Sequence, residues 1–132
     1  MTITHRTDIR NTATDAVVDA IDVGALNANG KIQLWSADLT VKIAEIDCQN
    51  PAFGNASGGS ATLNDTAVVT TDNAGTIGIL RFVDRDGNQV MDLEVGVPGT
   101  AGCGGADIEM TATTFGAGDT IGIQNLAYEA IQ

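Results

Sequence analysis

The chain has 132 residues, of which 43% are hydrophobic and 17% charged, and its 17 acidic residues outnumber its six basic ones. This length fits one domain, 1–132, and the apolar content excludes a disordered chain. The net charge of -11 repels phosphate backbones, so we expect no nucleic-acid partner. No apolar run could span a bilayer, and the polar residues 1–8 lack a signal-peptide core, so we expect synthesis in the cytoplasm and no membrane partner.

The first predicted element is a helix over residues 7–23, preceded by a flexible arm of residues 1–6. Thr7 or Asp8 can cap the helix, because a short side-chain oxygen accepts the free N–H groups of the first turn. Gly24 supplies the stop, since glycine adopts the left-handed conformation cheaply.

Apolar residues recur along this helix at helical spacing and predict one buried stripe: Ile9, Ala13, Val17, Ala20 and Ile21. Arg10, Thr14 and Asp22 lie away from the centre of this stripe. We expect the stripe to dock on the rest of the domain, with a neighbouring protein as the alternative cover. If it docks on its own domain, Val17→Asp destabilises the isolated protein by roughly 2 kcal/mol or more.

After the helix the apolar pattern changes to a period of two residues. Residues 31–37 predict a strand with Ile32 and Leu34 on one face, and 36–38 predict a tight connection to a second alternating run, 39–43. The alternation changes parity after that run, which indicates a bulge or a strand end near Ala44.

A glycine-punctuated loop follows over 50–60, and its one large apolar residue, Phe53, is expected to reach the edge of the core. Residues 61–71 predict one or two weak strands. Apolar residues on both faces make 76–84 the strongest strand and place it centrally, and Asp86-Gly87 is a hairpin signal. The remaining segments are a strand over 88–97 with Met91, Leu93 and Val95 inward, a glycine-rich loop over 98–105, and strands over 106–113 and 119–130. Seven or eight short strands with frequent turns predict a mainly β fold, a β-sandwich or jelly-roll-like barrel over 30–130 behind one N-terminal helix.

Few residues suggest chemistry. Cys48 and Cys103 form no CxxC pair, and His5 is the single histidine, which excludes the common zinc ligand sets. The cysteines are interpreted as small buried hydrophobic residues, with a disulfide between them as the alternative. We expect Cys48→Ala to leave the fold intact.

Three further patterns have simple structural interpretations. The segment 84–88 carries aspartates but departs from the calcium-loop spacing, which favours a plain hairpin turn. Alternation puts Asp92 and Glu94 on a charged outer surface and not in a catalytic cleft. Trp35 and Tyr128 could stack on a sugar, but core packing is the preferred interpretation. No GxSxG motif occurs. We therefore expect no enzyme activity, no catalytic residue, no metal and no cofactor.

The order of these motifs resembles small structural virion proteins of tailed bacteriophages. The resemblance covers nearly the whole chain and rests on these segments: the Arg-Asn helix 9–19, the strand 30–35, the loop Asn50–Gly54 followed by Gly58-Gly59, the hairpin 80–87, the strand 90–96, the segment 106–108 and the closing strand 118–123.

This resemblance implies a virion protein made in the host bacterial cytoplasm, and the leading hypothesis is a capsid decoration (cement) protein. Its expected partners are the major capsid protein or other virion proteins, and it is expected to form a homo-oligomer on the particle. The alternatives are a neck, tail or fibre-associated component, or a carbohydrate- or host-surface-binding module. The arm is the candidate partner contact, through Met1, Thr2, Ile3, Thr4, His5 and Arg6.

Overall fold

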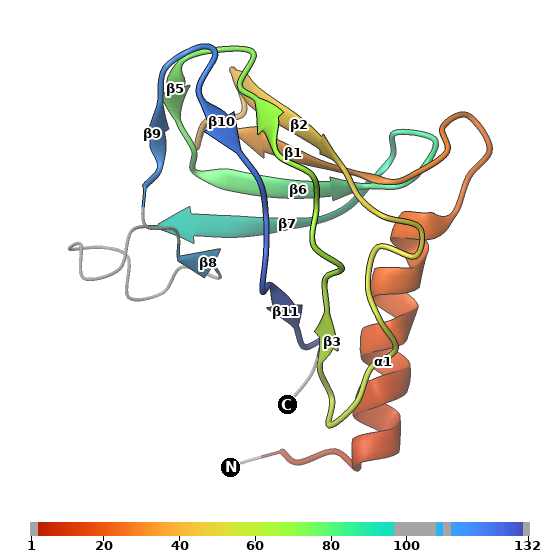
Figure 1. The fold of residues 1–132 in the computed structure, drawn as a ribbon. Coiled ribbons are helices and arrows are strands. Elements are labelled where there is room, and N and C mark those ends of the chain that lie inside the picture. Colours follow the sequence, from red (N-terminus) through yellow and green to blue (C-terminus); the bar gives the residue numbers. More distant parts are fainter. Residues whose placement is uncertain (1–2, 97–107, 110–111, 131–132) are drawn as a thin grey trace.

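A five-stranded sheet is the largest element of the fold. The computed structural model describes residues 3–96, 108–109 and 112–130. The strands of this sheet lie in the order β2-β1-β6-β7-β8, and all neighbours are antiparallel except β7 and β8, which are parallel. Their bounds are β1 Lys31–Trp35, β2 Lys42–Asp47, β6 Ile79–Val83, β7 Gln89–Gly96 and β8 Ile108–Glu109. The predicted central strand is confirmed, because β6 pairs with β1 on one side and β7 on the other (Figure 1).

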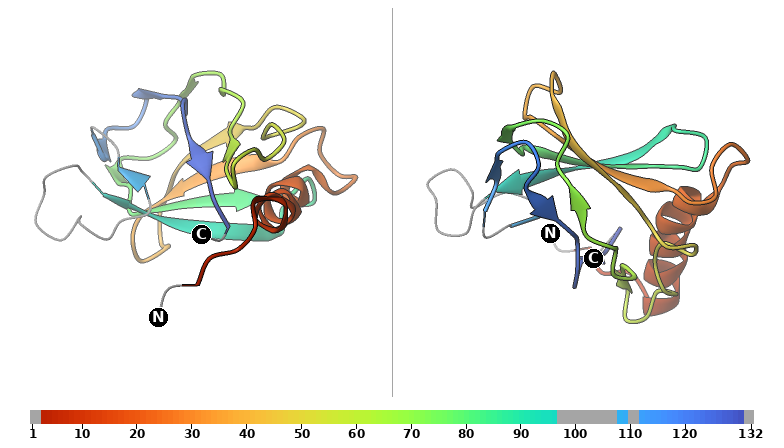
Figure 2. Two further views of the ribbon diagram at one scale, coloured as in Figure 1. Left: turned by 90° about the horizontal axis from the view of Figure 1, so that it is seen from below. Right: turned by 45° about the horizontal axis from the view of Figure 1, so that its top comes forward.

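Three short strand pairs form a second layer over one face of this sheet (Figures 1 and 2). They are β3 Ala61–Thr62 with β11 Ala127–Tyr128, β4 Val69–Thr70 with β10 Thr120–Ile121, and β5 Gly75–Thr76 with β9 Thr114–Phe115. The predicted fold class, mainly β and sandwich-like with one N-terminal helix, is confirmed.

The core lies between the sheet and the second layer. Alternation in β1 buries Ile32 and Leu34 completely, as predicted, while Gln33 and Trp35 point away from the core. Phe53 also reaches the core as predicted, where its ring lies 5.6 Å from that of Phe82 between centroids. One cluster of buried apolar side chains therefore joins the loop, the sheet and the second layer.

The helix lies at one end of the sheet and consists of α1, Thr7–Asp19, with a final 3-10 turn, η1, Ala20–Asp22 (Figure 1). Its bounds agree with the prediction, but the predicted cap is wrong. The residue in the cap position is Arg6, with no side-chain cap, and the Asp8 carboxylate instead accepts the N–H of Ile9 at 2.9 Å.

The predicted second strand begins too early in the sequence. Residues 36–41 form a turn in which Leu39 has a φ of 60° and the Asp38 carboxylate accepts bonds from the hydroxyls of Ser36 and Thr40. These local hydrogen bonds outweigh the alternating apolar pattern, so β2 starts only at Lys42. The predicted bulge near Ala44 is confirmed, because the register between β1 and β2 shifts there.

The hairpin between β6 and β7 forms as predicted. Gly87 has a φ of 85°, the left-handed conformation that favours glycine, and its N–H donates to the Asp84 carbonyl at 3.1 Å. In β7, Val95 is buried, whereas Met91 and Leu93 are half-buried and pack against the core. The glycine-rich loop over 98–105 lies outside the described residues.

Candidate partner-binding surface

The face of α1 that docks on the domain differs from the predicted stripe. Thr14, Val18 and Ile21 are buried, whereas Ile9 is 44% exposed and Val17 is half-buried. The helix therefore docks on its own domain through a face rotated from the predicted one.

Polar side chains explain this rotation, because they attach α1 to the loop over 56–59. The Thr14 hydroxyl donates to the Gly59 carbonyl at 2.8 Å, and the Gly59 N–H donates to the Asn11 amide oxygen at 2.7 Å. The Ala56 N–H donates to the Asp15 carboxylate at 2.8 Å, and the Arg10 guanidinium donates to the Gly58 carbonyl. Such bonds provide partners for loop backbone groups that would otherwise be buried without any. Polar residues therefore occupy the docked face of α1, which the apolar pattern predicted to be exposed to solvent.

Thr14 also connects the helix to the end of the second layer, since its hydroxyl oxygen accepts the N–H of Ala130 at 3.1 Å. We expect Thr14→Val, which keeps the shape, to lower the free energy of unfolding by about 1–3 kcal/mol, because the buried Gly59 carbonyl and the half-buried Ala130 N–H lose their partner. Thr12→Val is the matched control: the Thr12 hydroxyl is exposed and, within the described part of the chain, bonds the Asp8 carbonyl of its own helix. Equal melting temperatures for the two variants would contradict this prediction.

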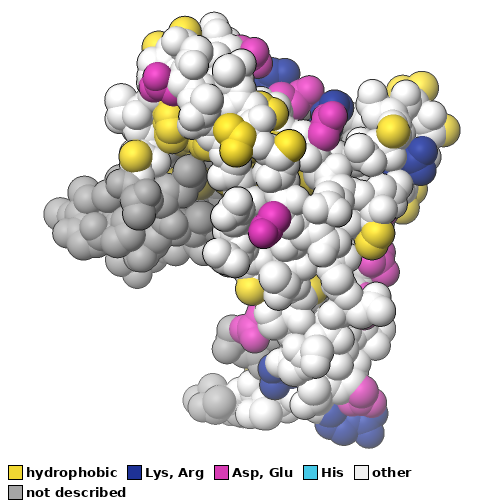
Figure 3. Space-filling model, in the orientation of Figure 1, with side chains coloured by type: hydrophobic (Ala, Val, Ile, Leu, Met, Phe, Trp, Pro, Cys, Tyr) yellow, Lys and Arg dark blue, Asp and Glu magenta, His cyan; other side chains and the backbone are white. Residues whose placement is uncertain are grey.

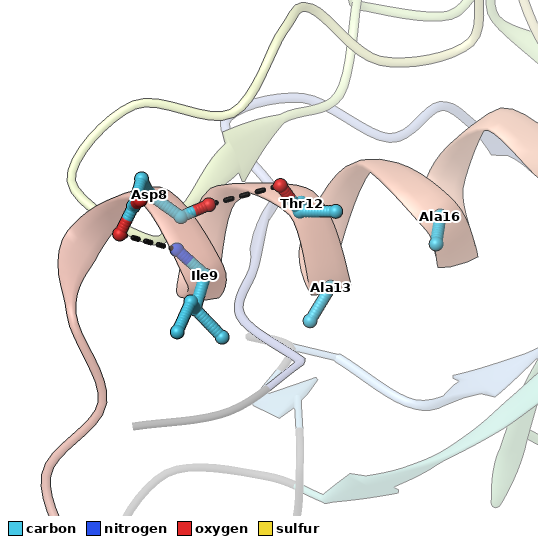
Figure 4. A pocket seen from close by; sticks show the side chains of 5 residues that line it. All are labelled: Asp8, Ile9, Thr12, Ala13 and Ala16. Atoms are coloured by element: carbon cyan, nitrogen blue, oxygen red, sulfur yellow. Dashed lines mark hydrogen bonds between the residues drawn. The ribbon is translucent and has the colours of Figure 1, made fainter.

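The opposite side of α1 carries a shallow groove of about 330 Å³. Its described lining residues all belong to the helix: Asp8, Ile9, Thr12, Ala13 and Ala16. Figure 4 shows Ile9 and Ala13 projecting from one side of the helix, while Asp8 and Thr12 lie along the other edge. The groove thus presents apolar side chains beside a carboxylate, and no other described element lines it.

Exposed apolar side chains concentrate around this helix. Seven large hydrophobic residues are exposed among the described residues, and four of them lie in the arm, in α1 or in the segment just after it: Ile3, Ile9, Val23 and Leu26. Ile3 and Ile9 lie at the start of the helix, whereas Val23 and Leu26 follow its end, so the four side chains form two separate groups. Apolar side chains gathered on the surface of a folded domain are typical of interaction sites. We call the arm, the groove and these four side chains the helix surface.

The predicted contact arm is only partly described. Met1 and Thr2 lie outside the described residues, whereas residues 3–6 run as an extended segment into the start of α1. Ile3 is 65% exposed, and the Arg6 guanidinium pairs with the Asp8 carboxylate at 3.1 Å. The arm therefore continues the helix surface at the groove.

The hairpin aspartates serve the local backbone. The Asp84 carboxylate accepts the N–H groups of Asp86 and Asn88, and that of Asp86 accepts the N–H groups of Ala25 and Leu26. These backbone bonds hold the pKa of both carboxyls below the usual range. The prediction of a plain turn agrees with this geometry, and the described residues contain no group of three or more potential metal-ligating side chains.

Two aromatic residues lie on different layers. Tyr128 of β11 packs against the core as predicted, but the prediction for Trp35 is wrong: it is half-buried on the outer face of the sheet, where its indole N–H donates to Gln33 at 3.1 Å. The two rings therefore do not form one stacking platform. The carboxylate of Asp92, on the same outer face, is bound by Arg81 through two hydrogen bonds of 2.7 and 2.9 Å.

Cys48 is a buried residue, as the sequence predicts, and its thiol is free, while Cys103 lies outside the described residues. Burial, with smaller contributions from Asp22 and Asp47, raises the pKa of the thiol to about 12. Since the thiolate is the nucleophile, Cys48 should resist iodoacetamide at pH 8 in the native protein and react rapidly in denaturant. Peptide-resolved mass spectrometry tests this, and rapid native labelling at Cys48 would contradict it.

The chain matches no protein-family model, no curated protein and no solved structure in the three comparisons made. Within the described part of the chain, none of the helices has the length and apolar character needed to cross a bilayer.

Proposed function

We propose that this chain is a structural virion protein of a tailed bacteriophage, a capsid decoration protein that binds and stabilises the assembled shell. The observation that carries the proposal is the helix surface. The domain fills its own core and anchors α1 through polar bonds, yet it leaves Ile9, Val23 and Leu26 exposed. The order of the sequence motifs, which resembles that of small virion proteins, supplies the biological setting.

Binding to the shell alone would explain stabilisation. A protein that binds the assembled shell, and not its free subunits, shifts the assembly equilibrium by mass action. A small patch supports only modest affinity at each site, but linked contacts between many copies on one particle would add avidity. The protein needs no catalytic group or cofactor for this role.

The net charge of the protein indicates what kind of partner surface would bind it. The chain carries a formal charge of -11, and Figure 3 shows acidic side chains spread over the visible face, with basic ones in its upper, right and lower parts. A basic surface would attract it, and copies would repel one another except where their charges are complementary. The partner under this proposal is the major capsid protein or another virion protein, reached after synthesis in the host cytoplasm.

Copy number distinguishes the shell from the neck or tail. Quantitative mass spectrometry of purified particles should give on the order of hundreds of copies for a shell protein, because the shell repeats its subunits by symmetry. About twelve copies or fewer would reject decoration and support a neck, tail or fibre component.

The helix surface can be tested by particle binding. Ile9→Asp and deletion of residues 1–6 should each leave the melting temperature nearly unchanged and weaken binding to undecorated shells about tenfold or more. Val68→Asp is the control, because Val68 is 64% exposed, directly precedes β4 and is not part of the helix surface. Unchanged binding by both test variants would exclude the helix surface as the shell contact.

A further inference from the structure

The face of the five-stranded sheet turned away from the described second layer carries a second candidate interface. One side of β1 and β6 is buried against the second layer, through side chains such as Leu34 and Leu80. The other side, here called the outer sheet face, consists of the outward side chains of β2, β1, β6 and β7. The single tryptophan of the chain, Trp35, lies on it.

Polar contacts hold this face in one arrangement. Glu45, Gln33, Arg81 and Asp92 lie side by side in register across four strands. The Gln33 amide donates to the Glu45 carboxylate at 3.0 Å and accepts the Trp35 indole N–H. The Arg81 guanidinium donates two hydrogen bonds to the Asp92 carboxylate. Side chains already fixed by such bonds lose little entropy when a partner binds.

Charge indicates which partner this face suits. The outer sheet face carries three cations, Lys31, Lys42 and Arg81, against four carboxylates. The other described residues carry three cations against twelve carboxylates. Two copies of the chain would therefore repel each other least when they meet through the outer sheet face.

One row of this face is complementary to itself. Lys42, Trp35, Ile79 and Glu94 are aligned across β2, β1, β6 and β7. A half-turn about an axis along the strands reverses the row, so Lys42 of one copy meets Glu94 of the other, and Trp35 meets Ile79. We propose that the outer sheet face is the contact between copies of this chain, with this row at its centre.

The expected association is weak. Strand spacing and rise give a face of roughly 20 by 20 Å, or about 400 Å² per copy. This is half the roughly 800 Å² per partner of a stable interface. In the same arrangement Glu45 meets Asp92 of the second copy, which opposes binding, although both already have a cation partner. A dissociation constant on the order of 1 mM is therefore expected. A protein gathered on a particle would reach such concentrations locally, but the contact itself does not require a particle.

Charge exchange tests the proposed row. Sedimentation equilibrium of the full chain, between about 0.05 and 2 mM, should show a monomer–dimer equilibrium for the natural sequence. Lys42→Glu and Glu94→Lys should each weaken dimerisation about tenfold or more. The double variant should restore it, because the pair is re-formed with its signs exchanged.

Asp19→Lys is the matched control, since it changes net charge as Glu94→Lys does but lies on α1, and it should not weaken the dimer. Circular dichroism of each variant separates misfolding from a lost contact. A monomer at all concentrations, or a double variant no better than its parents, would overturn the proposal. Neither outcome bears on shell binding, which is measured on particles.

Discussion

Val18→Asp should lower the free energy of unfolding of the isolated protein by about 3 to 5 kcal/mol. Val18 is 1% exposed on the docked face of α1, in the apolar core cluster. A carboxylate there would lose its hydration, and no cation among the described residues is bonded at that position, so the helix would have to detach or the acid remain protonated. Urea unfolding followed by circular dichroism gives the measurement.

Val17→Asp is the natural control, because it makes the same chemical change one residue away. The sequence places Val17 in the buried stripe, but the structure leaves it half-buried. With Val17 half-buried, Val17→Asp is expected to lower the free energy of unfolding by about 1 kcal/mol or less. If Val17→Asp proved the more damaging of the two, the docked face of α1 would be assigned incorrectly.

Gly30→Ala should destabilise the fold by about 3 kcal/mol through a steric clash. A Cβ at this position would lie 2.5 Å from the Ile21 carbonyl oxygen and 2.9 Å from that of Val83. Both atoms belong to the backbone, so neither can rotate away as a flexible side chain could. The close approach of the η1 turn to the β6 end depends on this glycine.

Gly54→Ala is the matched control. The nearest atom to its Cβ would be the Thr62 carbonyl oxygen at 3.9 Å, an ordinary van der Waals distance, and its backbone is not left-handed. We expect a change in stability within about 0.5 kcal/mol. Thermal unfolding of both variants tests the contrast, and similar melting temperatures would show that the approach at Gly30 is not tight.

Local periodicity predicted the elements that are regular over several residues. Alternating burial in β1 and the apolar faces of β6 are visible in the sequence, because each position's exposure follows from its parity alone. The short strands β3, β4, β10 and β11 lie within the predicted segments 61–71 and 119–130, but their bounds and their pairing carry no such signal. Two residues are too few to show a period, and their partners lie more than 40 residues away in the chain.

The orientation of α1 could not be read from apolar spacing. Thr14 is buried because of a bond to Gly59, 45 residues away, and a bond from Ala130, 116 residues away. Polar residues 10, 11, 14 and 15 do recur at helical spacing in the sequence. This pattern indicates a docked face only when the loop over 56–59 is known to lie against it. The predicted burial of the stripe is therefore confirmed at Ile21 but wrong at Ile9 and Ala13, which border the groove.

The bond between Thr14 and Ala130 also constrains the order in which the molecule forms. During synthesis α1 emerges long before its partners, and a helix of this length is marginal alone in water. Its docking needs first the loop over 56–59 and then Ala130, so the final closure waits until Ala130 has been made. Contacts of such sequence separation slow folding, and ribosome-bound chains stopped before Ala130 should leave the helix accessible to chaperones and proteases.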